Sequence, residues 1–181
     1  MVFEATPNYI FHPQVAKRIF QFDPNIKLIS IVRNPTERAL SAWIMHHFLM
    51  SPTKRPNFFR TFKQTITEEI ELIEQGKEDR RNIVKKGLYY QQFVKYYELF
   101  DKKNLLIIEN EDLLKNCEQK LSRIFQFLGV AEEYLPLKKN NVSPKRDFKS
   151  EYKNELALLD EYYYPENQKF YKLVGQEFNW D

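Results

Sequence analysis

The sequence predicts an α/β fold in which a small parallel sheet is flanked by helices. Two short apolar runs, residues 27–32 and 104–108, are typical of strands buried on both faces. Segments with the spacing of amphipathic helices lie before, between and after these runs. This alternation favours parallel pairing of the two strands through right-handed crossovers. A chain of 181 residues suits one compact unit, so residues 1–181 are expected to form a single domain.

The composition indicates a folded protein and argues against several classes of function. Hydrophobic residues make up 43% of the chain, which is enough to build a core. The formal net charge of +3 comes without a dense basic run, so we expect no nucleic-acid partner, although an anionic ligand fits. No apolar run is long enough to span a membrane. With Cys117 as its one cysteine, the chain can form no intramolecular disulfide or cysteine-rich metal site. We therefore expect no metal, and a cytoplasmic location.

The first predicted strand is set between two helices. Apolar residues at helical spacing predict a helix over 12–22, which ends at the turn formed by residues 23–25. The strand at 27–32 follows, and a second helix is expected from Pro35 to about Leu49. Its start is well marked because Asn34 can cap it, and Pro35 suits the first helical position.

The rest of the chain alternates in the same way. The aromatic residues between Leu88 and Phe100 fall at helical spacing and are expected to lie in the core. A strand at 104–108 follows. The remaining predicted helices cover residues 60–75, one or two segments within 109–127, 151–161 and 165–174.

A candidate anion site lies where the first strand meets the helix after it. Arg33 closes the strand, and ligands of open parallel sheets bind beyond the carboxyl ends of strands. The N-terminus of the following helix attracts negative charge, and Ser41 lies one turn beyond Glu37 on that helix. A guanidinium and a hydroxyl that converge can bind a phosphate. The alternative is that Arg33 pairs with a carboxylate and Ser41 is an ordinary helix residue.

The run Ile-Val-Arg33-Asn-Pro-x-x-Arg-x-x-Ser41 resembles the 3′-phosphate-binding motif of sulfotransferases that use 3′-phosphoadenosine 5′-phosphosulfate (PAPS). The heparan sulfate branch of that family is the most similar one. Further segments resemble motifs of this branch in the same order, and together they cover nearly the whole chain: residues 4–9, 86–89, 140–146, 167–171 and 175–180. The resemblance implies a parallel sheet like that of P-loop NTPases. A nucleotide kinase shares that sheet, but such a relationship does not explain the Arg33 motif.

The resemblance also implies roles for individual residues. Arg33 and Ser41 would hold the 3′-phosphate of PAPS or of adenosine 3′,5′-bisphosphate, the desulfated product. Lys145 and Arg146 would close over the cofactor, although a solvated basic loop is the alternative reading. Tyr89, with the nearby Gly87, would shape the substrate or cofactor cleft, and the alternative reading is that Tyr89 belongs to the core.

Two departures from the family pattern bear on catalysis. The family's Lys-x-Gly-Thr-Thr loop, which wraps the 5′-phosphosulfate, has no counterpart before Glu4, and no glycine precedes Gly76. The lysine of the family's Glu-Lys-Thr-Pro motif is replaced by Ala5. We therefore expect an N-terminally incomplete fold in which the catalytic residue is unknown and Glu4 is only a weak candidate.

Two functions are consistent with these observations. One is the transfer of a sulfuryl group from PAPS to a hydroxyl or amine of a carbohydrate, in which case we expect residues 1–181 by themselves to be a poor enzyme. The other is a catalytically inactive module that binds a nucleotide or a glycan. Because the sheet would lack its first strand, its exposed edge also predicts a homodimer.

Overall fold

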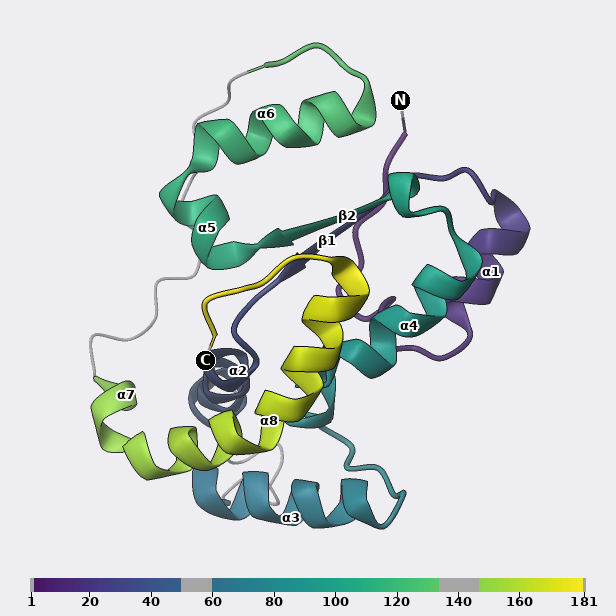
Figure 1. Ribbon diagram of the computed structural model, residues 1–181. Coiled ribbons are helices and arrows are strands. Elements are labelled where there is room, and N and C mark those ends of the chain that lie inside the picture. The colour runs from purple at the N-terminus through teal and green to yellow at the C-terminus, as the bar shows by residue number, and fades with distance from the viewer. Residues whose placement is uncertain (1, 50–59, 134–146, 181) are drawn as a thin grey trace.

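The computed structural model describes residues 2–49, 60–133 and 147–180. Within them, β1 (Leu28–Val32) and β2 (Leu105–Glu109) form a two-stranded parallel sheet, with Leu28 opposite Leu105 and Val32 opposite Glu109. This confirms the predicted α/β fold with a parallel sheet flanked by helices (Figure 1). The helices are α1 Val15–Phe22, α2 Pro35–Leu49, α3 Phe62–Glu74, α4 Tyr89–Leu99, α5 Asn110–Lys115, α6 Cys117–Leu128, α7 Phe148–Glu151 and α8 Lys153–Val174.

The helices cover the two sides of the sheet differently. Figure 1 shows α6 on one side of the strands, with α4 and α8 on the other. On the second side, Val32 and Ile107 pack in one buried cluster with Phe93 of α4 and Phe170 of α8. This cluster confirms that the aromatic face of α4 belongs to the core.

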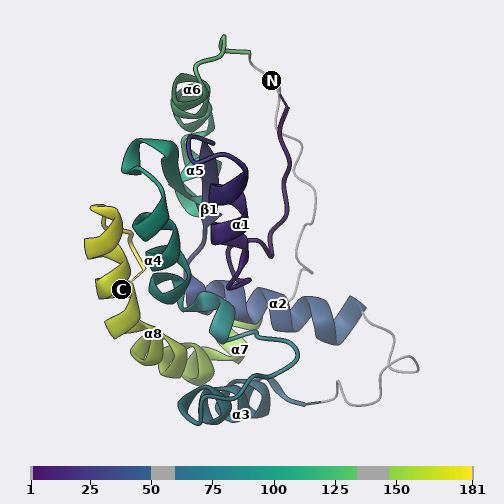
Figure 2. The same cartoon turned by 90° about the vertical axis from the view of Figure 1, so that its right-hand side faces the viewer.

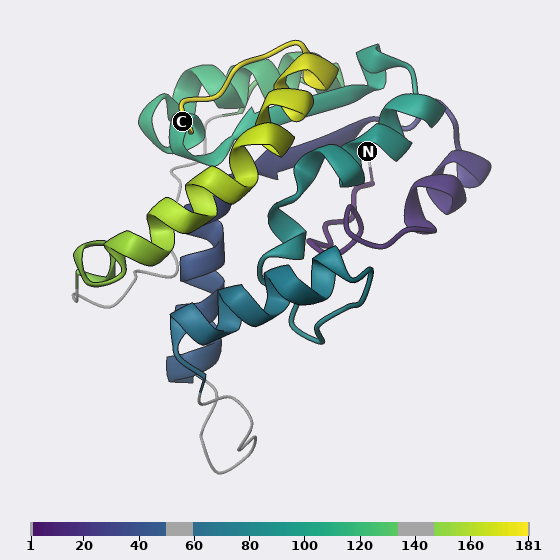
Figure 3. The same cartoon turned by 60° about the horizontal axis from the view of Figure 1, so that its bottom comes forward.

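A second buried cluster lies away from the sheet. Figure 2 shows α3 at the opposite end of the molecule from α6. Trp43 of α2, Phe62 of α3 and Tyr163 of α8 belong to this second cluster. Figure 3 shows α2 leaving the carboxyl end of β1, with α8 crossing beside it. The start of α2 is thereby fixed between the sheet and the second cluster.

The prediction of separate helices over 151–161 and 165–174 is wrong, because α8 is continuous and contains Pro165. Proline removes one helical hydrogen bond and usually kinks a helix. Here residues on both sides of Pro165, including Tyr163 and Phe170, are fully buried. Burial of large aromatic side chains is worth more than one lost hydrogen bond, so packing keeps the helix continuous.

None of the helices in the described part of the chain is both long and apolar enough to cross a lipid bilayer.

Candidate anion-binding site

Arg33 follows the last residue of β1, at the edge of the sheet where both strands end. Its backbone is held by one side chain: the Tyr89 hydroxyl donates to the Arg33 carbonyl oxygen at 2.9 Å, and the Arg33 N–H donates to the same hydroxyl at 3.4 Å. The guanidinium therefore projects from a fixed point between β1 and α2.

The guanidinium of Arg33 lies between two carboxylates. Its Nη2 is 3.1 Å from Oε2 of Glu37, and its Nε is 3.3 Å from Oε1 of Glu111. The Arg33 side chain is 36% exposed, so an anion can approach it from solvent. The carboxylate pairing named above as an alternative is thus present, and a bound phosphate would have to compete with it.

Glu37 connects Arg33 to a second cation. Its other carboxylate oxygen, Oε1, accepts a hydrogen bond from Lys149 Nζ. Burial by itself would raise the pKa of Glu37, but the hydrogen bonds from Lys149 and Arg33 outweigh burial and lower it. Glu37 is therefore a firmly ionised bridge that holds two positive side chains close together.

The N-terminus of α2 is capped as predicted, because the Glu37 N–H donates to Asn34 Oδ1 at 3.0 Å. Pro35 has no N–H, so the first turn of this helix offers an anion fewer backbone donors than an ordinary helix. Side chains must supply most of the binding. Ser41 is half-buried on α2, one turn beyond Glu37.

No residue of the segment 140–146, which resembles the family's late basic loop, lies in the described part of the chain. Lys145 and Arg146, which the resemblance assigns to cofactor binding, lie outside the described residues. Lys149, which the sequence reasoning missed, contacts Glu37 from α7. The sequence signal that could have found Lys149 is its position, three residues after Arg146, for which cofactor binding is predicted.

Tyr89 lies in the core and is only 7% exposed. Its ring is 5.6 Å from that of Phe170 and 5.7 Å from that of Trp180, measured between centroids. Burial raises the pKa of its hydroxyl. With its hydroxyl turned to the Arg33 backbone, Tyr89 is placed to support the site; a direct contact with substrate stays a prediction.

Gly87 is needed for close packing. A Cβ added at this position would lie 2.6 Å from Oη of Tyr163, which is closer than real Cβ atoms approach. The Tyr163 hydroxyl donates to the Val84 carbonyl oxygen at 2.8 Å, so the ring is not free to move away. Gly87 therefore allows close packing against Tyr163, and its role in shaping a cleft stays a prediction.

Glu4 takes part in a local network at the N-terminal segment. Its Oε1 accepts a hydrogen bond from Thr6 Oγ1 at 3.4 Å and another from the Tyr9 hydroxyl. The bond to Glu4 raises the pKa of Tyr9. Tyr9 in turn accepts a bond on its carbonyl oxygen from the Tyr96 hydroxyl at 3.1 Å. These contacts anchor the segment that carries Glu4 to α4.

The acidic residues after β2 are each engaged by a partner. Glu109 accepts a hydrogen bond from Trp180 Nε1 at 2.7 Å, and burial raises the pKa of its carboxyl. Glu111 pairs with Arg33, and Asp112 pairs with Lys120. No group of three or more His, Cys, Asp or Glu residues in the described chain is placed to hold a metal ion.

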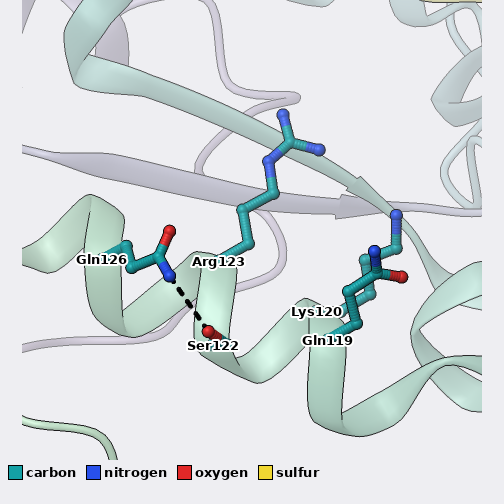
Figure 4. Close-up of a pocket in the computed structure, with 5 residues that line it drawn as sticks. All are labelled: Gln119, Lys120, Ser122, Arg123 and Gln126. Atoms are coloured by element: carbon teal, nitrogen blue, oxygen red, sulfur yellow. Dashed lines mark hydrogen bonds between the residues drawn. The ribbon is translucent and has the colours of Figure 1, made fainter.

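A surface hollow of about 310 Å³ lies on α6 and includes Lys120, the partner of Asp112. Figure 4 shows the residues that line it: Gln119, Lys120, Ser122, Arg123 and Gln126. All of them belong to one helix, and none of them is among the charged residues around Arg33, which are Glu37, Glu111 and Lys149. We place the candidate site at Arg33 because this residue lies at the carboxyl end of a parallel strand, where open sheets bind their ligands, whereas the hollow is lined by a single helix.

Comparison with known proteins assigns the chain to a family. Residues 11–172 match the family described as Sulfotransferase domain, and the chain belongs to this family. The resemblance inferred from the Arg33 motif is thereby confirmed.

Individual relatives agree with this assignment. The chain is 28% identical over 203 residues to heparan sulfate glucosamine 3-O-sulfotransferase 6 of Mus musculus, covering 98% of this chain and 56% of that protein. It is 24% identical over 253 residues to the membrane-associated sulfotransferase kil1 of Dictyostelium discoideum, covering 99% of this chain and 53% of that protein. The chain thus spans about half the length of these curated relatives.

A solved structure shares the fold. The crystal structure of a sulfotransferase from Alicyclobacillus acidocaldarius superimposes with a TM-score of 0.72 at 24% sequence identity. The match covers 97% of this chain and 65% of that chain.

Proposed function

We propose that this chain carries the 3′-phosphate-binding part of a sulfotransferase, which transfers a sulfuryl group from PAPS to a hydroxyl or amine of a carbohydrate. The observation that carries the proposal is the position of Arg33. This chain belongs to the sulfotransferase family, and its Arg33 lies between the carboxyl end of the parallel strand β1 and the start of α2. That is where open parallel sheets bind their ligands.

The side chains around Arg33 fit a phosphate. Arg33 offers a guanidinium that can bind two oxygens at once, and Ser41 offers a hydroxyl on the helix that follows. Lys149 adds a second positive charge through its shared contact with Glu37. PAPS, when bound, supplies the activated sulfuryl group. The residues of this chain would bind and orient the distant end of the nucleotide, and such positioning lowers the barrier of a displacement reaction.

The names of the relatives support a carbohydrate acceptor. Several of them are heparan sulfate glucosamine 3-O-sulfotransferases. Glu4 is the candidate proton acceptor in the described chain, since its carboxylate already accepts hydrogen bonds from two hydroxyl groups. The hydroxyl group of a carbohydrate acceptor would donate a hydrogen bond to the Glu4 carboxylate in the same way.

Calorimetric titration with adenosine 3′,5′-bisphosphate tests the binding step. Arg33→Ala is expected to weaken binding about 10- to 100-fold, because a charge-assisted hydrogen bond is worth about 1.5–3 kcal/mol. Ser41→Ala removes one neutral hydroxyl and is expected to cost about 2- to 10-fold. Arg18→Ala, on the exposed side of α1, is the charge-matched control and should bind as the wild type does. Equal affinity of wild type and Arg33→Ala would remove Arg33 from the site.

Sulfuryl transfer is tested separately with radiolabelled PAPS and a panel of heparan sulfate and simple sugar acceptors. Transfer that Glu4→Gln abolishes, with nucleotide affinity unchanged, supports Glu4 as the proton acceptor. Transfer that persists in Glu4→Gln would exclude that role. Nucleotide binding without transfer to any acceptor would contradict the proposed activity and favour a module that only binds.

We also propose that the chain forms a homodimer through the edge of β1. In the described chain β1 pairs only with β2, and two of its apolar side chains, Ile29 and Ile31, are 38% and 53% exposed. An apolar edge strand is a template for pairing with another chain.

A further inference from the structure

The backbone of Arg33 makes its hydrogen bonds with a side chain. Within the sheet, a neighbouring strand makes the equivalent bonds. The β1–β2 ladder ends with Val32 opposite Glu109, so Arg33 lies one residue beyond it. Its carbonyl oxygen and its N–H both meet the Tyr89 hydroxyl, at 2.9 and 3.4 Å. One hydroxyl thus makes hydrogen bonds with both the carbonyl oxygen and the N–H of Arg33, the residue that follows β1 and precedes α2.

Tyr89 is well suited to hold a neighbour in place, because its ring is buried and its own support is rigid. The segment before it is clamped by Glu69, a carboxylate that is 1% exposed. Glu69 accepts hydrogen bonds from the N–H groups of Ile83, Val84 and Lys85, at 2.8, 2.8 and 2.9 Å. Side chains locked by packing and hydrogen bonds give a site its precision.

We propose that Tyr89 is a positioning residue for the anion site: its hydroxyl fixes the Arg33 backbone at the junction of β1 and α2, and thereby fixes the direction of the guanidinium. The inference rests on the proposed function, because it assumes that Arg33 binds a phosphate group. It assigns Tyr89 an action through Arg33 rather than on the ligand itself. A ring that is only 7% exposed, with its hydroxyl engaged by backbone, agrees with that assignment.

A double-mutant cycle separates this role from direct contact with the ligand. Affinity for adenosine 3′,5′-bisphosphate is measured for wild type, Tyr89→Phe, Arg33→Ala and the double variant. Tyr89→Phe is expected to weaken binding about 3- to 10-fold when Arg33 is present, as loss of one hydrogen bond does. In the Arg33→Ala background it should have almost no effect, because residues that act through one another are not additive. Additive losses would show that Tyr89 touches the nucleotide, and would overturn the inference.

Tyr96→Phe is the matched control. Tyr96 lies on the same helix and is 6% exposed, and its hydroxyl donates to a backbone carbonyl oxygen, that of Tyr9. This variant is expected to lose stability in the same way as Tyr89→Phe while keeping wild-type affinity. An equal loss of affinity in both variants would assign the effect to general destabilisation.

A second measurement does not depend on nucleotide binding. The NMR order parameter of the Arg33 amide is expected to fall in Tyr89→Phe and to stay at the wild-type value in Tyr96→Phe. An unchanged value in Tyr89→Phe would overturn the positioning role even if the nucleotide binds. If the wild type binds no nucleotide, the proposed function fails, and the order parameter still decides whether Tyr89 fixes Arg33.

Discussion

At the scale of single residues, Arg33 is held by the groups with which a ligand would compete. Glu37 and Glu111 neutralise its charge in the structure. Glu37 is shared with Lys149, whereas the contact between Glu111 and Arg33 is a simple pair. The two carboxylates therefore have different consequences for binding. Removing Glu111 frees the Nε side of the Arg33 guanidinium and leaves the contacts of Glu37 with Arg33 and Lys149 in place.

Glu111→Gln is expected to strengthen the binding of adenosine 3′,5′-bisphosphate by up to about 5-fold, because a partly exposed ion pair of about 0.2–1 kcal/mol no longer competes with the phosphate. Calorimetry at fixed ionic strength measures the change. Glu118→Gln, an exposed residue in the first turn of α6, removes the same charge and should change affinity little. Weaker binding by Glu111→Gln would show instead that Glu111 orients Arg33 for the ligand.

At the scale of elements, α3 is tied to the segment before α4 by one buried carboxylate. Glu69 receives three backbone N–H groups, from Ile83, Val84 and Lys85. Burial nevertheless raises the pKa of Glu69, so its hydrogen bonds do not fully offset the loss of hydration. Such a group is costly to leave half-satisfied.

Glu69→Gln is expected to lower the free energy of unfolding by about 1–3 kcal/mol, because the new amide group faces the Ile83 N–H and leaves that donor without an acceptor. Urea denaturation at neutral pH measures the loss. Glu71→Gln, exposed on the same helix, should stay within about 0.5 kcal/mol of the wild type. Equal stability of the two variants would contradict a clamping role for Glu69.

At the scale of the whole molecule, the apolar side chains on one face of the sheet are buried along β2 and exposed along β1. Leu106 and Ile108 of β2 are 5% and 2% exposed, whereas their partners in register, Ile29 and Ile31, are 38% and 53% exposed. Apolar side chains on an edge strand favour association between chains.

Ile31→Lys is expected to shift self-association toward the monomer, because a charge on an edge strand opposes pairing. Sedimentation velocity over a range of concentrations measures this. Leu158→Lys, on α8 at 39% exposure, introduces the same charge away from the sheet and should associate as the wild type does. A wild-type chain that sediments as a monomer at every concentration would rule out the proposed dimer.

The sequence by itself determined the features that depend on neighbouring residues. The apolar runs located both strands, Asn34 was identified as the cap of α2, and the aromatic spacing of α4 indicated a core face. These signals are local, because hydrogen bonding and side-chain periodicity within one element decide them. The Arg33 motif is equally local, since a strand end and a helix start follow each other directly in the chain. The roles assigned to Lys145 and Arg146 stay predictions, as does the single domain.

Only the tertiary structure decided which groups meet at Arg33. The contacts of Arg33 with Glu111 and Tyr89, and of Glu37 with Lys149, join segments far apart in the chain. No periodicity encodes such contacts, because they depend on how β1, α4, α5 and α7 pack around the carboxyl end of the sheet. The continuity of α8 through Pro165 was decided in the same way. Local propensity favours a break there, and burial of the aromatic residues on both sides outweighs it.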